Sequence, residues 1–220
     1  MAKRFLLSSK LTVFVAALLY SILTSTAAHA VLIEINGASF TPGTGYGVDG
    51  SETSSPTLLD VQFSTSGFIV QSFSLDTVGQ SETFDFGTVN FLEPNSGGGI
   101  QAAETDNLGV IADLIFTSPL GLTEMVSAIG AAITGSVSDD AVDYTLTWTP
   151  LLVNFGIGGQ FQISLLDLSF SGQGIQTQTA TITLLALPQS VTTAIPEPAT
   201  FFLLGIGLVA LGALARRRRV

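Results

Sequence analysis

Residues 142–149 read VDYTLTWT, and this stretch decides the predicted fold class. Its apolar side chains alternate one by one with polar ones, the apolar set being Val142, Tyr144, Leu146 and Trp148. Successive side chains of a β-strand point to opposite faces of the sheet, so a period of two predicts a strand with one buried face. An amphipathic helix would instead repeat its apolar residues three and four positions apart.

Similar alternations, bounded by Gly, Asn, Ser and Asp, occur on both sides of this stretch. They predict further strands at residues 31–35, 59–64, 68–76, 84–91, 110–116, 161–170 and 177–187. About eight short strands predict an all-β domain over residues 31–188, an antiparallel β-sandwich or a jelly-roll-like fold. Long loops are expected at residues 41–55 and 93–100. The chain has no cysteine, so the domain must be stabilised by its core alone, for which its length suffices.

Local signals refine these strands. Asn36-Gly37 is a strong turn dipeptide, so we expect a tight turn after the first strand. The apolar parity changes around Gly87 and again within residues 161–170, which predicts a bulge or a bend at each place. Residues 122–134 fit a short helix or a flat strand about equally, because their small residues suit both and their glycines weaken a helix.

The first 30 residues have the tripartite plan of a secretory signal peptide. A basic start precedes an apolar run at residues 11–23, which is too short to span a bilayer comfortably. Ala28-His29-Ala30 then has the A-x-A form of a cleavage site. We expect residues 1–30 to be removed, which implies export; an uncleaved N-terminal anchor is the alternative.

A mostly polar linker is expected at residues 189–195, before a C-terminal segment with three parts. Pro196-Glu197-Pro198 favours an extended backbone. Residues 199–215 are uncharged and almost wholly apolar, and a helix over them would be roughly 26 Å long, near the thickness of a bilayer core. Four consecutive basic residues follow and should stay cytoplasmic because they resist translocation: Arg216, Arg217, Arg218 and Arg219.

Residues 196–220 together resemble the PEP-CTERM sorting signal. The resemblance implies export across the inner membrane of a Gram-negative bacterium, transient anchoring through residues 199–215, and processing by a membrane-embedded exosortase. Pro196, Glu197 and Pro198 would then be the recognised motif, and Arg216 to Arg219 the membrane retention signal. The family is associated with bacteria that make exopolysaccharide in biofilms or flocs. An ordinary type I membrane anchor is the alternative.

Charge is strongly segregated along the 220 residues. Residues 31–195 contain no Lys, Arg, His or Cys but hold 16 of the 17 carboxylates, so their formal charge is 0 − 16 = −16, against −10 for the chain. The usual bases, the thiolate and the preferred ligands of zinc, copper and haem are therefore missing there. Nucleic-acid binding is opposed by the uncompensated negative charge. We expect no enzymatic activity and no resident cofactor other than a weakly indicated Ca²⁺.

Residues 31–195 can still support Ca²⁺ binding and carboxylate-pair hydrolysis, because both need only oxygen-bearing side chains. A Ca²⁺ site is indicated where three carboxylates fall within five residues at a strand start, at Asp139, Asp140 and Asp143. Residues 104–107, ETDN, form a second oxygen-rich loop. Glycoside hydrolysis needs two carboxyl groups across a cleft, for which the candidates are Glu82, Asp85, Glu104 and Asp167.

The sequence favours an exported, non-enzymatic surface or extracellular-matrix protein with a structural or adhesive role linked to exopolysaccharide and biofilm. Expected partners are exosortase, the secretion machinery, the membrane and extracellular polysaccharide. The chain would be anchored transiently in the inner membrane and then reach the cell surface or the medium. A carbohydrate-binding module with a stacking platform of Trp148, Tyr144 or Tyr46 is the alternative, and a carboxylate-pair glycoside hydrolase is the second. Buried rings would exclude the platform.

Overall fold

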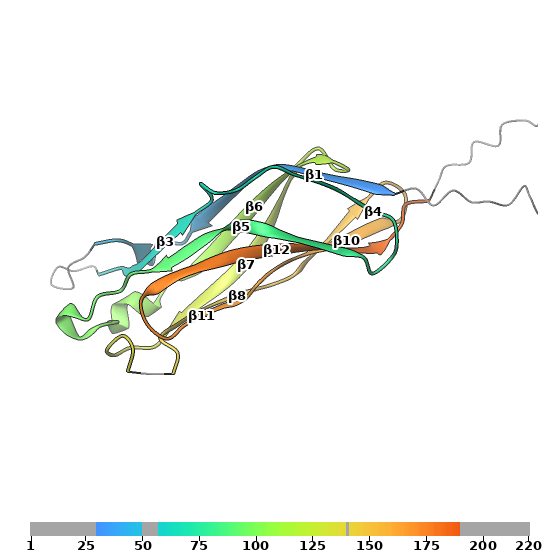
Figure 1. Ribbon diagram of the computed structural model, residues 1–220. Helices are drawn as coiled ribbons and strands as arrows, with labels where there is room; N and C mark the ends of the chain where they lie inside the picture. The colour runs from blue at the N-terminus through green and yellow to red at the C-terminus, as the bar shows by residue number, and fades with distance from the viewer. Residues whose placement is uncertain (1–29, 50–56, 140, 190–220) are drawn as a thin grey trace, which may run out of the picture.

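The structure is a computed structural model that describes residues 30–49, 57–139 and 141–189. These residues form two six-stranded sheets (Figure 1), which confirms the predicted all-β, β-sandwich-like class. The signal peptide, the sorting motif at 196–198 and the predicted helix at 199–215 lie outside the described residues. Among the residues that are described, no helix is long and apolar enough to cross a membrane.

Each sheet contains six strands from different parts of the chain. In spatial order, the first contains β11 (Leu168–Phe170), β8 (Tyr144–Trp148), β7 (Thr123–Ala132), β6 (Gly109–Ser118), β1 (Val31–Pro42) and β4 (Gln71–Leu75). The second contains β2 (Tyr46–Gly47), β3 (Leu59–Ser64), β5 (Ser81–Phe91), β12 (Gly174–Ala186), β10 (Gly159–Leu165) and β9 (Leu151–Phe155). Neighbours pair antiparallel except for the short parallel pair β2 and β3. Two 3₁₀-helices, η1 (Ser96–Gly98) and η2 (Ala102–Thr105), lie between β5 and β6.

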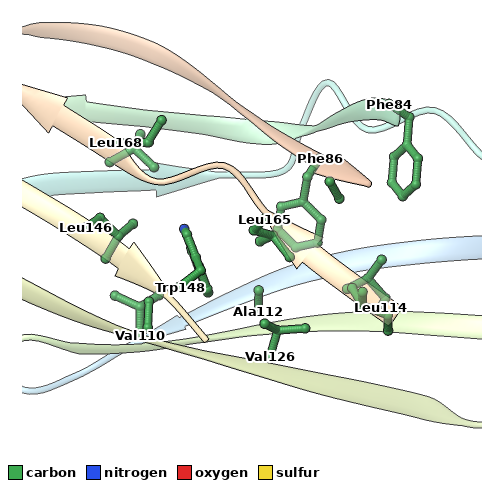
Figure 2. Close-up of a cluster of buried hydrophobic side chains, with 14 of the residues drawn as sticks. Phe84, Phe86, Val110, Ala112, Leu114, Val126, Leu146, Trp148, Leu165 and Leu168 are labelled. Atoms are coloured by element: carbon green, nitrogen blue, oxygen red, sulfur yellow. The ribbon is translucent and has the colours of Figure 1, made fainter. Parts of the chain in front are cut away.

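The core lies between the sheets and is built by the alternation seen in the sequence. Tyr144, Leu146 and Trp148 of β8 are buried, as the pattern VDYTLTWT predicts. Figure 2 shows side chains of the first sheet, such as Leu114 and Trp148, facing Phe86 of the second sheet. Burying each large apolar side chain contributes about 1.5–3 kcal/mol, so these facing layers supply the main stabilisation of the fold.

The ambiguous segment 122–134 is a strand, β7. Val126 and Ala128 point into the core, whereas Ser127 and Ile129 are exposed, which is the alternation of a strand and not of a helix. Pairing on both sides, with β6 and with β8, satisfies the backbone hydrogen bonds of this segment. The tertiary context thus selects between two local preferences that the sequence left balanced.

The predicted tight turn at Asn36-Gly37 is wrong. β1 continues through this dipeptide to Pro42, and its pairing with β6 shifts register between Ile35 and Gly37. The dipeptide is therefore part of a β-bulge inside a long strand. A Cβ on Gly37 would lie 3.0 Å from Cδ1 of Ile115, so that side chain would have to shift slightly.

Both predicted changes of parity are confirmed. The pairing of β5 with β12 shifts register between Gln178 and Thr179, opposite Gly87, as expected of a bulge. Residues 161–170 are divided after Leu165, since β10 belongs to the second sheet and β11 to the first. The bend thus carries the chain from one layer to the other.

The ends of the sandwich differ in content. The start of β1 and the end of β12 lie at the same end, on the right of Figure 1. The opposite end, which we call the loop-bearing end, carries β2 and the segment with η1 and η2. The segment with η1 and η2 thus lies far from the point where the described chain begins and ends, where the turns after β4 and β9 also lie.

Candidate functional site

The aromatic residues proposed as a sugar platform are buried. Tyr144 has no exposed surface, Trp148 is 5% exposed and Tyr46 is 8% exposed. Tyr144 stacks between Phe91 and Phe170 in the core. The prediction of a stacking platform from these three rings is therefore wrong, because all three occupy the inward positions of their strands.

The two tyrosines form a buried hydrogen-bond chain. The Tyr46 hydroxyl donates to the Leu108 carbonyl oxygen at 2.8 Å and lies 2.9 Å from the Tyr144 hydroxyl. Tyr46 has only one hydroxyl hydrogen, so Tyr144 must donate to Tyr46. Burial raises the pKa of Tyr46 to about 12, and it raises the pKa of Tyr144 as well. Both hydroxyls therefore remain protonated and have a structural role in the core.

The acidic loop proposed for Ca²⁺ is only partly within the described residues. Asp140 lies outside them, and Asp139 is exposed. Asp143 is buried, and its Oδ2 accepts a hydrogen bond from the Ser138 N–H at 3.0 Å, which closes the turn. A Ca²⁺ ion at Asp139, Asp140 and Asp143 therefore stays a prediction.

The four candidate carboxylates for hydrolysis are divided among three segments of the chain. Glu82 and Asp85 are exposed on β5, whereas Asp167 lies in the bend between β10 and β11. Asp167 has a structural role, since its Oδ1 accepts a hydrogen bond from the backbone N–H of Trp148 at 2.8 Å. Of these four, only Glu104 is buried, and it belongs to a different group of acids.

Besides Asp143, three further buried carboxylates lie around the loop-bearing end of the sandwich. Asp60 is 2% exposed at the start of β3, Glu93 is fully buried just after β5, and Glu104 is fully buried in η2. We call Asp60, Glu93 and Glu104 the buried acidic cluster. Fully buried acids are rare unless they are paired, so this cluster is the most unusual chemical feature of the described residues.

Backbone N–H groups hold the cluster in place. The Asp60 N–H donates to Glu93 Oε2 at 2.9 Å, and the Gln101 N–H donates to Glu104 Oε2 at 2.6 Å. The Asp49 N–H donates to Asp60 Oδ1 at 2.9 Å. Each glutamate thus uses one oxygen in the loop structure. Within the part of the chain that the structure describes, Glu93 Oε1 and Glu104 Oε1 are buried without a hydrogen-bond partner.

The electrostatics of the cluster centre on Glu93. Burial is the largest cause that raises the pKa of Glu93 to about 7. The negative charges of Glu104, Asp60 and Asp49 act in the same direction, whereas the hydrogen bond from the Asp60 N–H opposes them. Glu93 thus lies close to other negative groups. No pattern in the sequence indicates this arrangement.

The outer face of the second sheet is a separate feature. Its hydroxyl and amide side chains form rows across three strands, with Thr83 opposite Thr181 and Gln162 opposite Thr183. The hydroxyls of Thr83 and Thr181 lie 2.8 Å apart. We call the outward residues Thr83, Thr179, Thr181, Thr183 and Gln162 the hydroxyl–amide face.

Comparison with protein families gives one match, and it falls at the C-terminus. The family model of the PEP-CTERM protein-sorting motif matches residues 194–219. The chain carries a PEP-CTERM sorting motif. The motif confirms the resemblance seen in the sequence and marks the chain for export, exosortase processing and the cell surface. The PEP-CTERM match covers none of the described sandwich, and no curated protein or solved structure matches the chain.

Proposed function

We propose that this chain is a non-enzymatic surface or extracellular-matrix protein of a Gram-negative bacterium, with a structural or adhesive role in exopolysaccharide-rich material. The observation that carries the proposal is the PEP-CTERM motif at residues 194–219. In this proposal the apolar residues 199–215 anchor the chain transiently in the inner membrane, and exosortase then processes it near Pro196-Glu197-Pro198. The sandwich is the part that remains outside.

The surface chemistry supports association with neutral polysaccharide. Residues 31–195 carry no Lys, Arg or His, so the exported part has no cationic group for a polyanion. The hydroxyl–amide face offers uncharged donors and acceptors that match sugar hydroxyls. Because Tyr46, Tyr144 and Trp148 are buried, binding would use these polar rows and not aromatic stacking by those rings.

Processing depends on the motif in this proposal. In a bacterium that encodes an exosortase, Glu197→Ala is expected to lower the amount of processed protein at least tenfold and to leave a tailed form in the membrane. Mass spectrometry of membrane and extracellular fractions measures this. Thr192→Ala, which lies outside the matched residues, is the matched control and should be processed normally. Normal processing in a strain without exosortase would contradict the proposal.

Polysaccharide retention tests the hydroxyl–amide face. A triple variant carries Thr179→Glu, Thr181→Glu and Gln162→Glu. It is expected to lose at least five-sixths of its cosedimentation with neutral exopolysaccharide, because carboxylates replace the hydrogen-bonding groups. The lost hydrogen bonding corresponds to roughly 1 kcal/mol of net binding free energy. The matched control places three glutamates on the first sheet's outer face, at Thr123, Ser127 and Thr147, which are exposed. Equal loss in both variants would assign the effect to charge alone and refute this face as the binding surface.

A further inference from the structure

Glu93 and Glu104 have no cationic side chain to pair with in the exported part of their own chain. Residues 31–195 contain no Lys, Arg or His, so no side chain there can form an ion pair with Glu93 or Glu104. Leaving carboxylates charged in a low-dielectric interior is strongly unfavourable. Whatever neutralises them must therefore come from the solution.

The hydrogen bonds of the cluster leave one oxygen of each glutamate unused. Glu93 and Glu104 each bind a backbone N–H through Oε2, which favours the charged form of a carboxylate and fixes its orientation. Each also keeps a buried Oε1 that has no partner among the described residues. The two carboxylates lie close enough for Glu104 to repel charge on Glu93. Two oriented, unpartnered anionic oxygens are the complement of a hard cation.

We propose that the buried acidic cluster is a Ca²⁺ site in which Glu93 and Glu104 provide the charged ligands through Oε1. Ca²⁺ takes six to eight oxygen ligands in flexible geometry, and it accepts backbone carbonyls and water beside carboxylates. Mg²⁺ demands stricter geometry and dehydrates reluctantly, so it suits a buried pair less well. The site differs from the loop at residues 138–143, and it does not depend on how the C-terminus is processed.

The number of carboxylates predicts a modest affinity. Among the described residues, no three His, Cys, Asp or Glu side chains converge on one metal position. Carbonyl and water oxygens must therefore complete the shell around Glu93 and Glu104. Such a site should bind in the range of about 0.1–1 mM that is typical of extracellular modules.

Metal titration of the purified full-length chain tests the site. After removal of metals with EDTA at pH 7.5, addition of 10 mM Ca²⁺ is expected to raise the melting temperature by about 5 °C. The same concentration of Mg²⁺ should raise it by less than half as much, and NaCl of equal ionic strength should have little effect. Isothermal titration calorimetry should find one Ca²⁺ per chain.

Conservative variants locate the site. Glu93→Gln and Glu104→Gln keep the shape and an acceptor oxygen for the backbone N–H but remove the charge, so each is expected to abolish the Ca²⁺-dependent shift. Glu82→Gln, an exposed acid on β5, and Asp139→Asn should keep the shift in full.

Two results would overturn the proposal. One is a Ca²⁺ response that survives in both Glu93→Gln and Glu104→Gln, or that is lost in Asp139→Asn, because this would move the ion to another place. The other is a wild-type chain that binds no Ca²⁺ in calorimetry and is stabilised only by lowering the pH, which would assign a proton to the cluster. Calorimetry on the wild-type chain decides this second case even if a variant does not fold.

Discussion

Replacing Tyr144 with alanine is expected to destabilise the sandwich by about 4 kcal/mol. Tyr144 has no exposed surface and stacks between Phe91 and Phe170, so its removal leaves a cavity between the sheets. At this domain size the loss corresponds to a fall in melting temperature of roughly 10 °C. Urea unfolding followed by circular dichroism measures the change.

Two further variants divide this effect into its parts. Tyr144→Phe keeps the stacked ring and loses only the hydrogen bond to the Tyr46 hydroxyl, so it should cost about 1 kcal/mol. Thr147→Ala changes an exposed position on the same strand and should stay within about 0.5 kcal/mol of the parent. A loss below about 1 kcal/mol for Tyr144→Ala would show that the ring is not part of the packed core.

The second large effect is expected at Gly130, where substitution by alanine should cost about 3 kcal/mol through overpacking. A Cβ there would collide with the Tyr46 hydroxyl and lie 2.9 Å from the Leu108 carbonyl oxygen. That same carbonyl accepts the Gly130 N–H at 2.7 Å and the Tyr46 hydroxyl at 2.8 Å, so the three groups are locked together. Thermal unfolding of the purified variant gives the measurement.

Two further variants serve as a control and a rescue for Gly130→Ala. A Cβ on Gly109, in the adjacent strand β6, would meet no atom within 4 Å, so Gly109→Ala should be nearly neutral. Adding Tyr46→Phe to Gly130→Ala removes the colliding hydroxyl and should recover part of the lost stability, although the Leu108 carbonyl remains. If Gly130→Ala and Gly109→Ala behaved alike, close packing at Gly130 would be refuted.

Strands with one buried face could be predicted from the sequence, because the alternation is a direct imprint of the two faces. VDYTLTWT became β8, and TQTATIT within β12 has its threonines outward and Ala180 and Ile182 buried. The turn predicted at Asn36-Gly37 is absent because the local turn preference of the dipeptide is weaker than the hydrogen-bonded pairing of β1 with β4 and β6. A dipeptide signal carries no information about such long-range pairing.

The buried acidic cluster could not be predicted, because the same local pattern assigns an acid between apolar residues to the wet face. Asp60 follows Leu59 and precedes Val61, yet all three are buried. Segments distant in the sequence cover the ends of β3 and β5, and this burial is a property of the assembled loops. The sorting motif, in contrast, is a contiguous linear signal and was therefore visible in the sequence.

The first and last described residues lie at the same end of the sandwich. This arrangement determines which end of the sandwich would face away from a point of attachment. β12 runs 13 residues from the loop-bearing end to the exit of the chain, a length of about 40 Å at roughly 3.3 Å per residue. If the chain is attached to any structure through its C-terminal side, the loops around Asp60, Glu93 and Glu104 become its outermost tip. A single point of attachment would thus orient every copy in the same sense, with its acidic end facing the surroundings.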